Sequence, residues 1–492
     1  MELKKILAGC ADLKAKGNLE LEITNITSDS REVKQGDMFV AIKGFDVNGH
    51  DFVKKAIENG AKVVLVNEDE LANIKEYITP DVTLVVTKDT REALAKCACN
   101  FYDNPSEKVK LIGVTGTKGK TTTTFMIKKI LEKQGIKTGL VGTIASYSGD
   151  RKIEDSDRTT PDSLKLQSLF AEMVKDNCQA IVMEVSSQSL KLHRVDGCNF
   201  NYCVFTNFSE DHISPKEHPN MEDYFNSKLK LFQMCQEGFI NADDINTIRV
   251  PALVPNCLVK SYGIDNECDL LAKDITITNS YVDFRVKING KNERIKTCIP
   301  GRFSVYNSLA AISIAEKMGC STDAIKEALL EVRVPGRSEL VDNPLGLTIM
   351  IDYAHSPESL QSILQAVKSY TRGKVISVFG CGGDRDTAKR PQMGEISGKI
   401  ADFTIITSDN PRTEVPEQIV KDIEVGMKKT NGKYKCVVDR TEAIKEAILM
   451  AVKNDIIVLA GKGHETYQEI NHEKHPYDER EIIKNIMDEI KK

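Results

Sequence analysis

The sequence has no run of about 20 apolar residues, which is the length that a membrane-spanning helix requires. It also lacks an excess of basic charge, since 67 Lys and Arg stand against 72 Asp and Glu and the net charge is −5. That balance does not support binding to nucleic acid or to an anionic membrane surface. The N-terminal segment is too charged, and its apolar run too short, for a secretory signal peptide.

Paired cysteine motifs are absent too. The 13 cysteines include no C-x-x-C pair, and the closest two are Cys97 and Cys99. An odd number at irregular spacing argues against a disulfide framework or a zinc site and favours free thiols in a reducing compartment. We therefore expect a cytoplasmic protein.

The chain of 492 residues is too long for one hydrophobic core, and its pattern predicts three α/β domains. Residues 1–105 form a small N-terminal domain with short strands between helical stretches. Strands alternate with helices over residues 106–333, which predicts a mostly parallel sheet of the P-loop ATPase type with an antiparallel hairpin inserted. Residues 334–492 predict a Rossmann-like, doubly wound domain.

The stretch GVTGTKGKTTTT, residues 113–124, has the composition of a phosphate-binding loop. It follows a short apolar run typical of a buried strand and precedes a helical pattern, so backbone N–H groups and the helix dipole would attract an anion. Lys120 would reach the β- and γ-phosphates, and the Thr121 hydroxyl would ligate Mg²⁺. The strict pattern G-x-x-x-x-G-K-[ST] fails at Val114, so a glycine-rich turn beside a surface lysine is the simpler alternative.

Two acidic or histidine-containing segments follow neighbouring predicted strands. Glu184 lies at the end of one strand, and His212 lies in TNFSEDHISP after the next. Both could ligate a metal near Thr121, and oxygen-rich ligation with one imidazole suits Mg²⁺ or Mn²⁺ better than zinc. The alternative is that both are ordinary loop residues.

Three charged loops follow strands of the third domain. GCGGDRDTAKRP carries Arg385, SDNPRTE places Arg412 in a tight Asn-Pro turn, and AGKGHETYQ offers Gly461 and Glu465. A guanidinium can bind a carboxylate or a phosphate through two parallel hydrogen bonds. Each loop alone could be a turn with solvated charges, but three on neighbouring strand ends indicate a binding site.

The order of these and further motifs resembles that of the Mur ligases: GTKGKTT, EVSSQSLKLHRV, TNFSEDH, GRFSVYNSLAA, VPGRSE, DYAHSPESL, GCGGDRDTAKRP, DNPRTE and GKGHETYQ. The N-terminal stretch TSDSREVKQGDMFVAIKGFDVNGHDF resembles that family as well. The resemblance covers essentially the whole chain. The ordered set is specific, whereas the phosphate loop alone is not.

The resemblance implies a ligase of peptidoglycan synthesis that uses ATP and Mg²⁺. ATP would convert a substrate carboxylate into an acyl phosphate, and the amine of an incoming amino acid would displace phosphate to form an amide. The implied acceptor is UDP-N-acetylmuramoyl-L-alanyl-D-glutamate, activated on its γ-carboxylate. The DNPR form of the Arg412 turn resembles the members that add meso-diaminopimelate. We expect a monomer that inserts into no membrane.

The resemblance also assigns roles to individual residues. Catalytic roles are expected for Lys120, Lys228 and His212, and the metal ligands are expected to be Thr121, Glu184, His212 and a carbamylated Lys228. The expected ATP contacts are Gly116, Thr117, Lys118, Gly119, Lys120, Thr121, Thr122, Asn307, Arg337 and Asp352. The expected contacts to the UDP-muramoyl-peptide are Ser28, Ser30, Phe45, Asp46, Val47, Arg158, Thr159, Thr160, Ser186 and Arg194. The expected amino-acid pocket comprises Arg385, Asp409, Asn410, Pro411, Arg412, Gly461 and Glu465.

Three departures from the family pattern fall on the acceptor side. Leu192 stands where a glutamine is usual, Arg158 replaces an asparagine, and residues 213–220 replace the usual LDYHGT. They leave open a paralogue with an altered acceptor, and an L-lysine-adding ligase is a further alternative. A folylpolyglutamate synthase shares the ligase core but begins directly with its ATP-binding domain, so the first domain argues against it. A nucleotide-binding scaffold without turnover would not need Lys228, Arg385 and Glu465 together.

Overall fold

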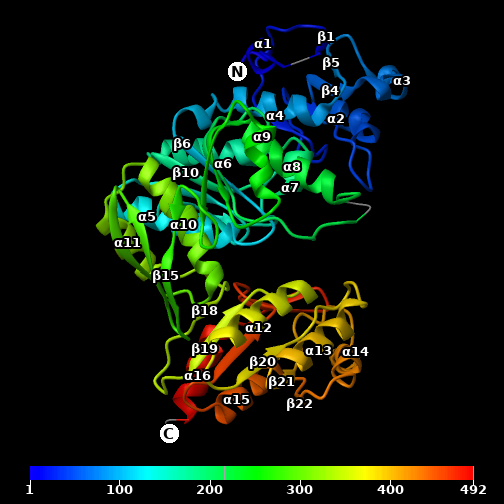
Figure 1. Ribbon diagram of the computed structural model, residues 1–492. Helices are drawn as coiled ribbons and strands as arrows, with labels where there is room; N and C mark the ends of the chain where they lie inside the picture. Colours follow the sequence, from blue (N-terminus) through cyan, green and yellow to red (C-terminus); the bar gives the residue numbers. More distant parts are fainter. Residues whose placement is uncertain (11, 215–216, 491–492) are drawn as a thin grey trace. The chain divides into compact units, whose positions relative to one another are not determined.

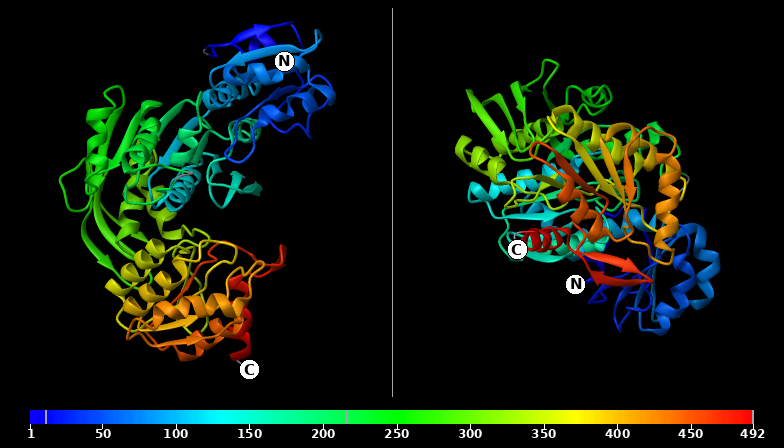
Figure 2. Two further views of the ribbon diagram at one scale, coloured as in Figure 1. Left: turned by 90° about the vertical axis from the view of Figure 1, so that its right-hand side faces the viewer. Right: turned by 90° about the horizontal axis from the view of Figure 1, so that it is seen from below.

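The computed structural model describes residues 1–10, 12–214 and 217–490, and it divides into two compact units (Figures 1 and 2). Unit 1 comprises Met1–Leu270 and Ala310–Ser321, and unit 2 comprises Leu271–Leu309 and Thr322–Lys492. The antiparallel hairpin that the sequence places in the central domain therefore groups with unit 2. The three domain boundaries read from the sequence stay a prediction.

A five-stranded sheet opens unit 1, in the order β1-β5-β4-β3-β2 with only β1 antiparallel. Alternate residues of β4 face two separate apolar clusters, as period-two burial on both faces requires. The strands are β1 (Lys14–Lys16), β2 (Ile26–Thr27), β3 (Met38–Val40), β4 (Val63–Asn67) and β5 (Thr83–Thr87). The helices are α1 (Leu3–Ile6), α2 (Val53–Glu58), α3 (Leu71–Ile74) and α4 (Thr90–Phe101).

The second sheet of unit 1 has nine strands in the order β14-β13-β12-β11-β6-β10-β7-β8-β9. Its middle strands, from β13 to β7, pair in parallel, and β7, β8 and β9 are antiparallel. The strands are β6 (Lys110–Thr115), β7 (Thr138–Val141), β8 (Ala145–Ser148), β9 (Arg151–Asp155), β10 (Ala180–Glu184), β11 (Phe200–Phe205), β12 (Cys235–Asn241), β13 (Leu258–Gly263) and β14 (Leu270–Leu271).

Helices α6 and α8 pack on one face of this sheet through a large cluster of aliphatic and aromatic side chains. The helices are α5 (Lys120–Lys133), α6 (Ser163–Lys175), α7 (Ser187–Lys191), α8 (Met221–Gln233), α9 (Val250–Leu253) and α10 (Arg302–Lys317), of which α10 begins in unit 2 and ends in unit 1. Because β6 lies between β10 and β11 in parallel register, the carboxyl ends of these three strands meet at one edge. That edge carries the phosphate loop, Glu184 and Asn207.

Unit 2 contains a six-stranded sheet in the order β18-β19-β23-β20-β21-β22, with only β18 antiparallel. One apolar cluster joins α12, α13 and α14 to one face, and another joins α15 and α16 to the other, so the doubly wound prediction is confirmed (Figure 1). The strands are β18 (Glu339–Leu340), β19 (Thr348–Asp352), β20 (Val375–Phe379), β21 (Phe403–Ile406), β22 (Tyr434–Cys436) and β23 (Ile456–Ala460). The helices are α12 (Pro357–Tyr370), α13 (Lys389–Ile400), α14 (Pro416–Met427), α15 (Arg440–Met450) and α16 (Glu479–Ile490).

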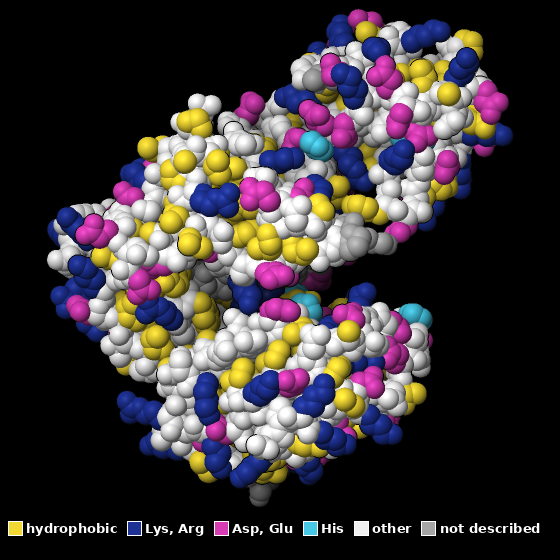
Figure 3. Space-filling view, turned by 45° about the vertical axis from the view of Figure 1, so that its right-hand side comes forward, with side chains coloured by type: hydrophobic (Ala, Val, Ile, Leu, Met, Phe, Trp, Pro, Cys, Tyr) yellow, Lys and Arg dark blue, Asp and Glu magenta, His cyan; other side chains and the backbone are white. Residues whose placement is uncertain are grey.

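The remaining strands of unit 2 pair in the antiparallel direction. A three-stranded sheet of β15 (Lys273–Ile277), β16 (Val282–Ile288) and β17 (Lys291–Thr297) contains the predicted hairpin and is followed by α11 (Thr322–Glu331). A short ribbon of β24 (Tyr467–Ile470) and β25 (Glu473–Pro476) follows β23. Among the helices of the described chain, none has the length and apolar character needed to cross a bilayer. On the face shown in Figure 3, acidic and basic side chains are interspersed, as the near-balanced composition predicts.

Candidate functional site

The predicted phosphate loop runs from β6 into α5, and its glycines adopt backbone conformations that other residues avoid. Gly116 has φ +146° and Gly119, the N-cap of α5, has φ +84°. A Cβ at Gly116 would lie 1.9 Å from the Thr206 Oγ1 atom. Val114 is buried within β6, so the departure from the strict glycine pattern falls in the strand and leaves the loop intact.

The segment after β11 holds this loop in place. Asn207 accepts a hydrogen bond from the Lys118 backbone N–H at 2.9 Å, and Thr206 donates to the Lys118 carbonyl at 2.6 Å. The Lys120 Nζ atom donates to the carbonyl oxygens of Gly116 and Thr117 at 2.9 and 3.1 Å. The ammonium group of Lys120 therefore lies over the loop in which a phosphate would be bound.

Glu184, at the end of β10, lies beside the first turn of α5. Its carboxylate accepts hydrogen bonds from the Thr121 hydroxyl at 3.0 Å, the Thr143 backbone N–H at 2.8 Å and the Thr143 hydroxyl at 3.1 Å. Glu184 and Thr121 are both buried, and their oxygen donors fit a hard divalent cation. The structure thus brings together two of the four residues expected to bind metal.

His212 lies apart from this pair of oxygen donors. Its side chain is exposed, its Nδ1 atom lies 3.2 Å from Glu217 Oε1, and its ring centre lies 5.8 Å from that of Tyr224. No hydrogen bond within the described residues links it to Thr121 or Glu184. Its role as a metal ligand stays a prediction.

Lys228 reaches the phosphate loop from α8. Its side chain is buried, its Nζ atom donates to the Gly116 carbonyl at 2.8 Å, and it lies 4.5 Å from the ring centre of Tyr224. Burial, reinforced by the nearby charge of Lys120, lowers the pKa of Lys228 well below its usual range. The lowered pKa favours the neutral form of the amine, which is the form that carbamylation requires.

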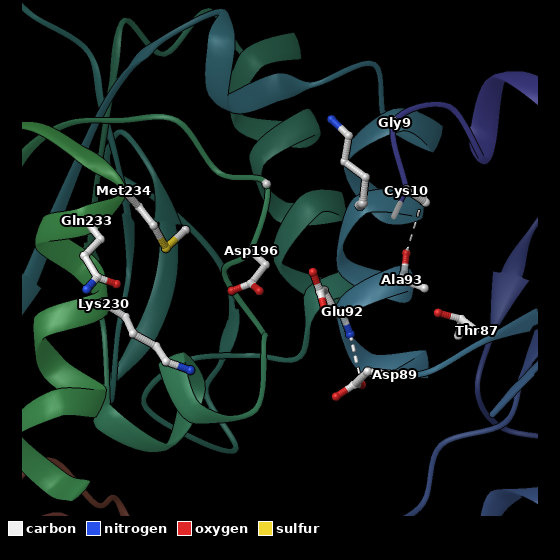
Figure 4. Close-up of a pocket in the computed structure, with 12 residues that line it drawn as sticks. Gly9, Cys10, Thr87, Asp89, Glu92, Ala93, Asp196, Lys230, Gln233 and Met234 are labelled. Carbon is white, nitrogen blue, oxygen red and sulfur yellow. Dashed lines mark hydrogen bonds between the residues drawn. The ribbon is translucent and has the colours of Figure 1, made fainter. Parts of the chain in front are cut away.

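Lys230, two residues further along α8, has a different environment. Its Nζ atom lies 3.5 Å from the Leu190 carbonyl, and it lines a cavity of 440 Å³. Figure 4 shows Lys230, Gln233 and Met234 along one side of that cavity, with Glu92 and Cys10 on the other. Lys230 therefore makes its contacts on a different side of α8 from the Lys228 contact with the phosphate loop.

Several residues expected to bind the muramoyl-peptide form one hydrogen-bonded cluster. The Thr160 hydroxyl donates to the Glu184 carbonyl at 2.9 Å and accepts from the Ser186 backbone N–H at 3.1 Å. Arg194 donates to the Thr160 carbonyl at 3.0 Å. Burial, together with the charge of Arg158, lowers the pKa of Arg194 to about 10. The like charges of Arg158 and Arg194 favour an anionic ligand. The Thr159 hydroxyl accepts a hydrogen bond from the Thr143 hydroxyl at 3.1 Å.

A buried hydrogen-bonded relay of Ser187, His218 and Asp223 was not predicted from the sequence. The His218 ring lies 2.6 Å from Asp223 Oδ2 through Nδ1 and 2.9 Å from the Ser187 hydroxyl through Nε2. Lys191 binds the same Asp223 oxygen at 2.8 Å. Burial lowers the pKa of His218, with Asp223 opposing. Although the order Ser-His-Asp resembles a hydrolase triad, Ser187 is 5% exposed and His218 is 0% exposed, so this relay braces α7 instead.

His218 belongs to the departure at residues 213–220, and residues 215–216 of that segment lie outside the described residues. No sequence pattern predicts the relay, because Ser187 and His218 are 31 residues apart in sequence and become neighbours only in the folded protein. Leu192 caps the C-terminal end of the same short helix.

Five of the residues expected to bind the UDP-muramoyl-peptide lie in the loops that follow β2 and β3 of the first sheet. Phe45 and Val47 are 61% and 59% exposed on either side of Asp46, which forms the tip of a turn. Two large apolar side chains exposed together are typical of a ligand-binding surface. Ser28 is exposed and Ser30 is buried, so only the first has a side chain open to a ligand.

The remaining expected nucleotide contacts belong to unit 2. Asp352 ends β19 and accepts from the Ser338 backbone N–H at 2.7 Å, and burial raises the pKa of its carboxyl group. The guanidinium carbon of Arg337 lies 4.6 Å from the ring centre of Tyr353. Asn307 is buried in α10. Their contact with ATP stays a prediction.

The expected amino-acid pocket lies at the adjoining ends of β20, β21 and β23. Asn410 donates to Glu465 Oε2 at 2.9 Å, and the buried Lys462 donates to Asn410 at 3.1 Å and to Glu465 at 3.2 Å. Gly461 has φ +115°, and a Cβ there would lie 2.5 Å from Asp409 Oδ2. The structure therefore joins the second and third predicted loops through direct hydrogen bonds.

Arg412 is held in the same pocket by a residue that the sequence did not single out. Its Nε donates to Glu469 Oε2 at 2.9 Å, and its Nη1 donates to the Gly383 carbonyl at 2.7 Å. Arg412 has φ +52°, which is the left-handed conformation, and follows Pro411. Arg385 is exposed and stands outside this network.

The fold and the two sites define a class of protein, the Mur ligases. Profiles of that family match three consecutive stretches: the Mur ligase family catalytic domain at residues 22–102, the Mur ligase middle domain at 114–315, and the Mur ligase glutamate ligase domain at 336–463. The chain belongs to the Mur ligase family, which confirms the resemblance read from the motifs.

Two relatives and one solved structure are similar to this chain over its full length. The UDP-N-acetylmuramoyl-L-alanyl-D-glutamate--2,6-diaminopimelate ligase of Caldanaerobacter subterraneus subsp. tengcongensis is 48% identical over 100% of both chains. Ligase 1 of the same name from Clostridium acetobutylicum is 45% identical, again over 100% of both. A solved structure of a ligase of that name aligns with a TM-score of 0.72 and 28% identity, covering 100% of this chain and 99% of the other.

Proposed function

We propose that this chain is an ATP-dependent ligase that adds meso-diaminopimelate to the γ-carboxylate of UDP-N-acetylmuramoyl-L-alanyl-D-glutamate in peptidoglycan synthesis. The observation that carries the proposal is the 48% identity, over both full chains, with a ligase named for that reaction. The phosphate loop and the pocket at the ends of β20, β21 and β23 supply the residue types that the chemistry needs.

The phosphate loop would bind ATP. Lys120, which bonds the carbonyls of Gly116 and Thr117, would exchange these for oxygens of the β- and γ-phosphates. Thr121 and Glu184 would hold Mg²⁺, which supplies positive charge against the phosphate oxygens when it is bound. Lys228, as a carbamate, would add anionic oxygen donors beside Gly116.

The cluster of Thr160, Ser186 and Arg194 would orient the acceptor. Its cationic character, strengthened by Arg158, suits a substrate that carries a diphosphate and carboxylates. Phosphorylation would turn the γ-carboxylate into an acyl phosphate with a good leaving group, and attack by the amine would release phosphate. Arg412 would bind the carboxylate beside the distal amine of diaminopimelate.

The test is ADP release by the purified protein with each substrate omitted in turn, combined with mass spectrometry of the product. Release should require ATP, Mg²⁺, the UDP-muramoyl-dipeptide and diaminopimelate together, and the product should contain one new amide. Equal turnover with L-lysine would favour a lysine-adding ligase. Turnover only with another UDP-muramoyl acceptor would favour a paralogue, and turnover with folate and glutamate would overturn the proposal.

A further inference from the structure

Three buried cysteines meet in the nine-stranded sheet. Cys203 lies in β11, Cys235 begins β12, and Cys257 directly precedes β13. Their sulfur atoms all lie within 4.8 Å of one another. Parallel pairing of β11, β12 and β13 brings them together although they are far apart in sequence, so the spacing argument against a metal site could not detect them.

The backbone and the exposure of the three cysteines show how their sulfur atoms are accommodated. A Cβ at Gly238, which pairs with Cys203, would lie 3.1 Å from the Cys203 sulfur and 2.3 Å from the Phe232 ring. Glycine therefore leaves the space that the sulfur occupies. Cys203 is fully buried, whereas Cys235 and Cys257 are 7% and 8% exposed, so the latter two retain a little solvent-accessible surface.

The donor set consists of sulfur alone. Within the described residues, no histidine or carboxylate joins the three thiols. The surroundings are apolar, because all three belong to the cluster of buried side chains that includes Phe232 and Val254. Thiolates are soft donors, so hard cations such as Mg²⁺ are excluded.

The soft ions differ in the net charge of the complex that each would form with three thiolates. Three thiolates give Cu⁺ a net charge of −2 and Zn²⁺ a net charge of −1, and zinc also requires a fourth ligand. A charge buried among apolar side chains is costly. A trivalent ion with three thiolates is neutral. We propose that Cys203, Cys235 and Cys257 form a binding site for a trivalent thiophilic metalloid, of which arsenic(III) is the probe.

The reaction is a balanced ligand exchange without oxidation or reduction. Arsenous acid carries three hydroxyl groups; three S–H and three As–O bonds break, three As–S bonds form, and three waters leave. An equilateral triangle with 4.8 Å sides places its centre about 2.8 Å from each corner, against about 2.3 Å for a metal–thiolate bond such as Zn–S. Small inward movements of the sulfur atoms therefore suffice.

The alternative is that the three thiols are only small apolar core residues. The test adds arsenite to the reduced, desalted full-length protein under anaerobic conditions. Native mass spectrometry should show one arsenic bound with three hydrogens lost, and X-ray absorption should show three sulfur neighbours. Thiol titration after unfolding in the trapping reagent should show three fewer free thiols per arsenic.

Single substitutions test whether these three cysteines are the ones that bind arsenite. Cys203→Ser, Cys235→Ser and Cys257→Ser should each weaken arsenite binding at least about a hundredfold, because one of three intramolecular ligands is lost. The matched control is Cys178→Ser, a buried cysteine of the same apolar cluster that lies outside the trio, and it should bind normally. Circular dichroism checks that each variant folds.

The proposal would be overturned by no binding to the unmodified protein, by binding that consumes only two thiols, or by binding that survives Cys203→Ser in a folded protein. Tighter binding of Zn²⁺ or Cu⁺ than of arsenite, measured with each ion alone, would overturn the charge argument and hence the assignment. X-ray absorption on the unmodified protein decides the ligand set even where a variant does not fold.

Discussion

The buried Nζ atom of Lys228 lies 2.8 Å from the carbonyl oxygen of Gly116, which ties α8 to the phosphate loop. Only a neutral amine reacts with carbon dioxide, and burial lowers the pKa of Lys228 well below its usual range, which favours the neutral form. A protonated lysine here would repel Mg²⁺, whereas a carbamate would supply two oxygen donors. The geometry is thus suited to the modification that the sequence predicts.

Lys228→Ala should reduce turnover at least about a hundredfold, because a charge-stabilising group beside the phosphates is lost. Added short carboxylic acids should partly restore activity by supplying the missing oxygens. Lys230→Ala is the matched control, since Lys230 lies two residues away and faces the cavity of Figure 4, and it should stay close to normal. Near-normal ADP release by Lys228→Ala would contradict the role.

Gly116→Ala should impair ATP binding, because the new Cβ would lie 1.9 Å from Thr206 Oγ1 at a backbone φ of +146°. Gly135→Ala is the control: Gly135 also has a positive φ, +86°, but has open space around its Cα. The control should lose only about 1–2 kcal/mol of stability from backbone strain.

Calorimetry with ATP and thermal unfolding of both variants check this prediction. We expect the dissociation constant for ATP to rise at least about tenfold in Gly116→Ala, which corresponds to about 1.4 kcal/mol, and to stay unchanged in Gly135→Ala. Equal ATP affinity in the two variants would mean that the loop accommodates the added Cβ beside Thr206 without loss of ATP binding.

The α/β sheets and the phosphate loop could be predicted because their signals are local: strand and helix periods, and glycines at a strand-to-helix turn. The approach of Glu184 to Thr121 follows from parallel strands ending at one edge. The contacts of His218 with Ser187 and of Arg412 with Glu469 could not be predicted, since these partners are 31 and 57 residues apart in sequence and meet only through tertiary folding. The cysteine trio escaped for the same reason, as its members lie on three different strands or their flanks.

The buried relay at His218 predicts a pH dependence of stability. Burial lowers the pKa of His218, so the unfolded chain, with a pKa of about 6.5, binds a proton more readily than the folded protein does. The free energy of unfolding should therefore be constant above about pH 7 and fall as the pH drops below about 6.5. Urea unfolding at pH 7.5 and 5.5 measures the difference.

His218→Gln removes the titrating group but keeps a side chain that can bond Ser187 or Asp223. Its stability should be lower than normal at pH 7.5 and should change less between pH 7.5 and 5.5 than that of the unmodified protein. His212→Gln, at an exposed histidine, is the control and should keep the normal pH dependence. An identical pH dependence in His218→Gln would exclude the relay as its source.

The preference for diaminopimelate over L-lysine should depend on Arg412. In the structure its Nε bonds Glu469 and its Nη1 bonds the Gly383 carbonyl, whereas Nη2 makes no hydrogen bond within the described residues. That side of the guanidinium can receive the carboxylate beside the distal amine of diaminopimelate, which L-lysine lacks. Charged hydrogen bonds contribute about 1.5–3 kcal/mol each, so two imply at least about a hundredfold preference in kcat/KM.

Arg412→Ala should lower kcat/KM for diaminopimelate by about a hundredfold or more and leave the KM for ATP nearly unchanged. Arg412→Lys keeps the charge but loses the paired hydrogen bonds, so it should give an intermediate loss. If Arg412 only anchors the turn through Glu469, then Glu469→Gln, which weakens that ion pair, should lower thermal stability and selectivity in parallel with Arg412→Ala. If Arg412 binds the substrate, selectivity should fall much further in Arg412→Ala than in Glu469→Gln at similar stability. Comparable kcat/KM values for the two amino acids in the unmodified enzyme would refute the assignment, because a guanidinium facing an ammonium group has no carboxylate to bind.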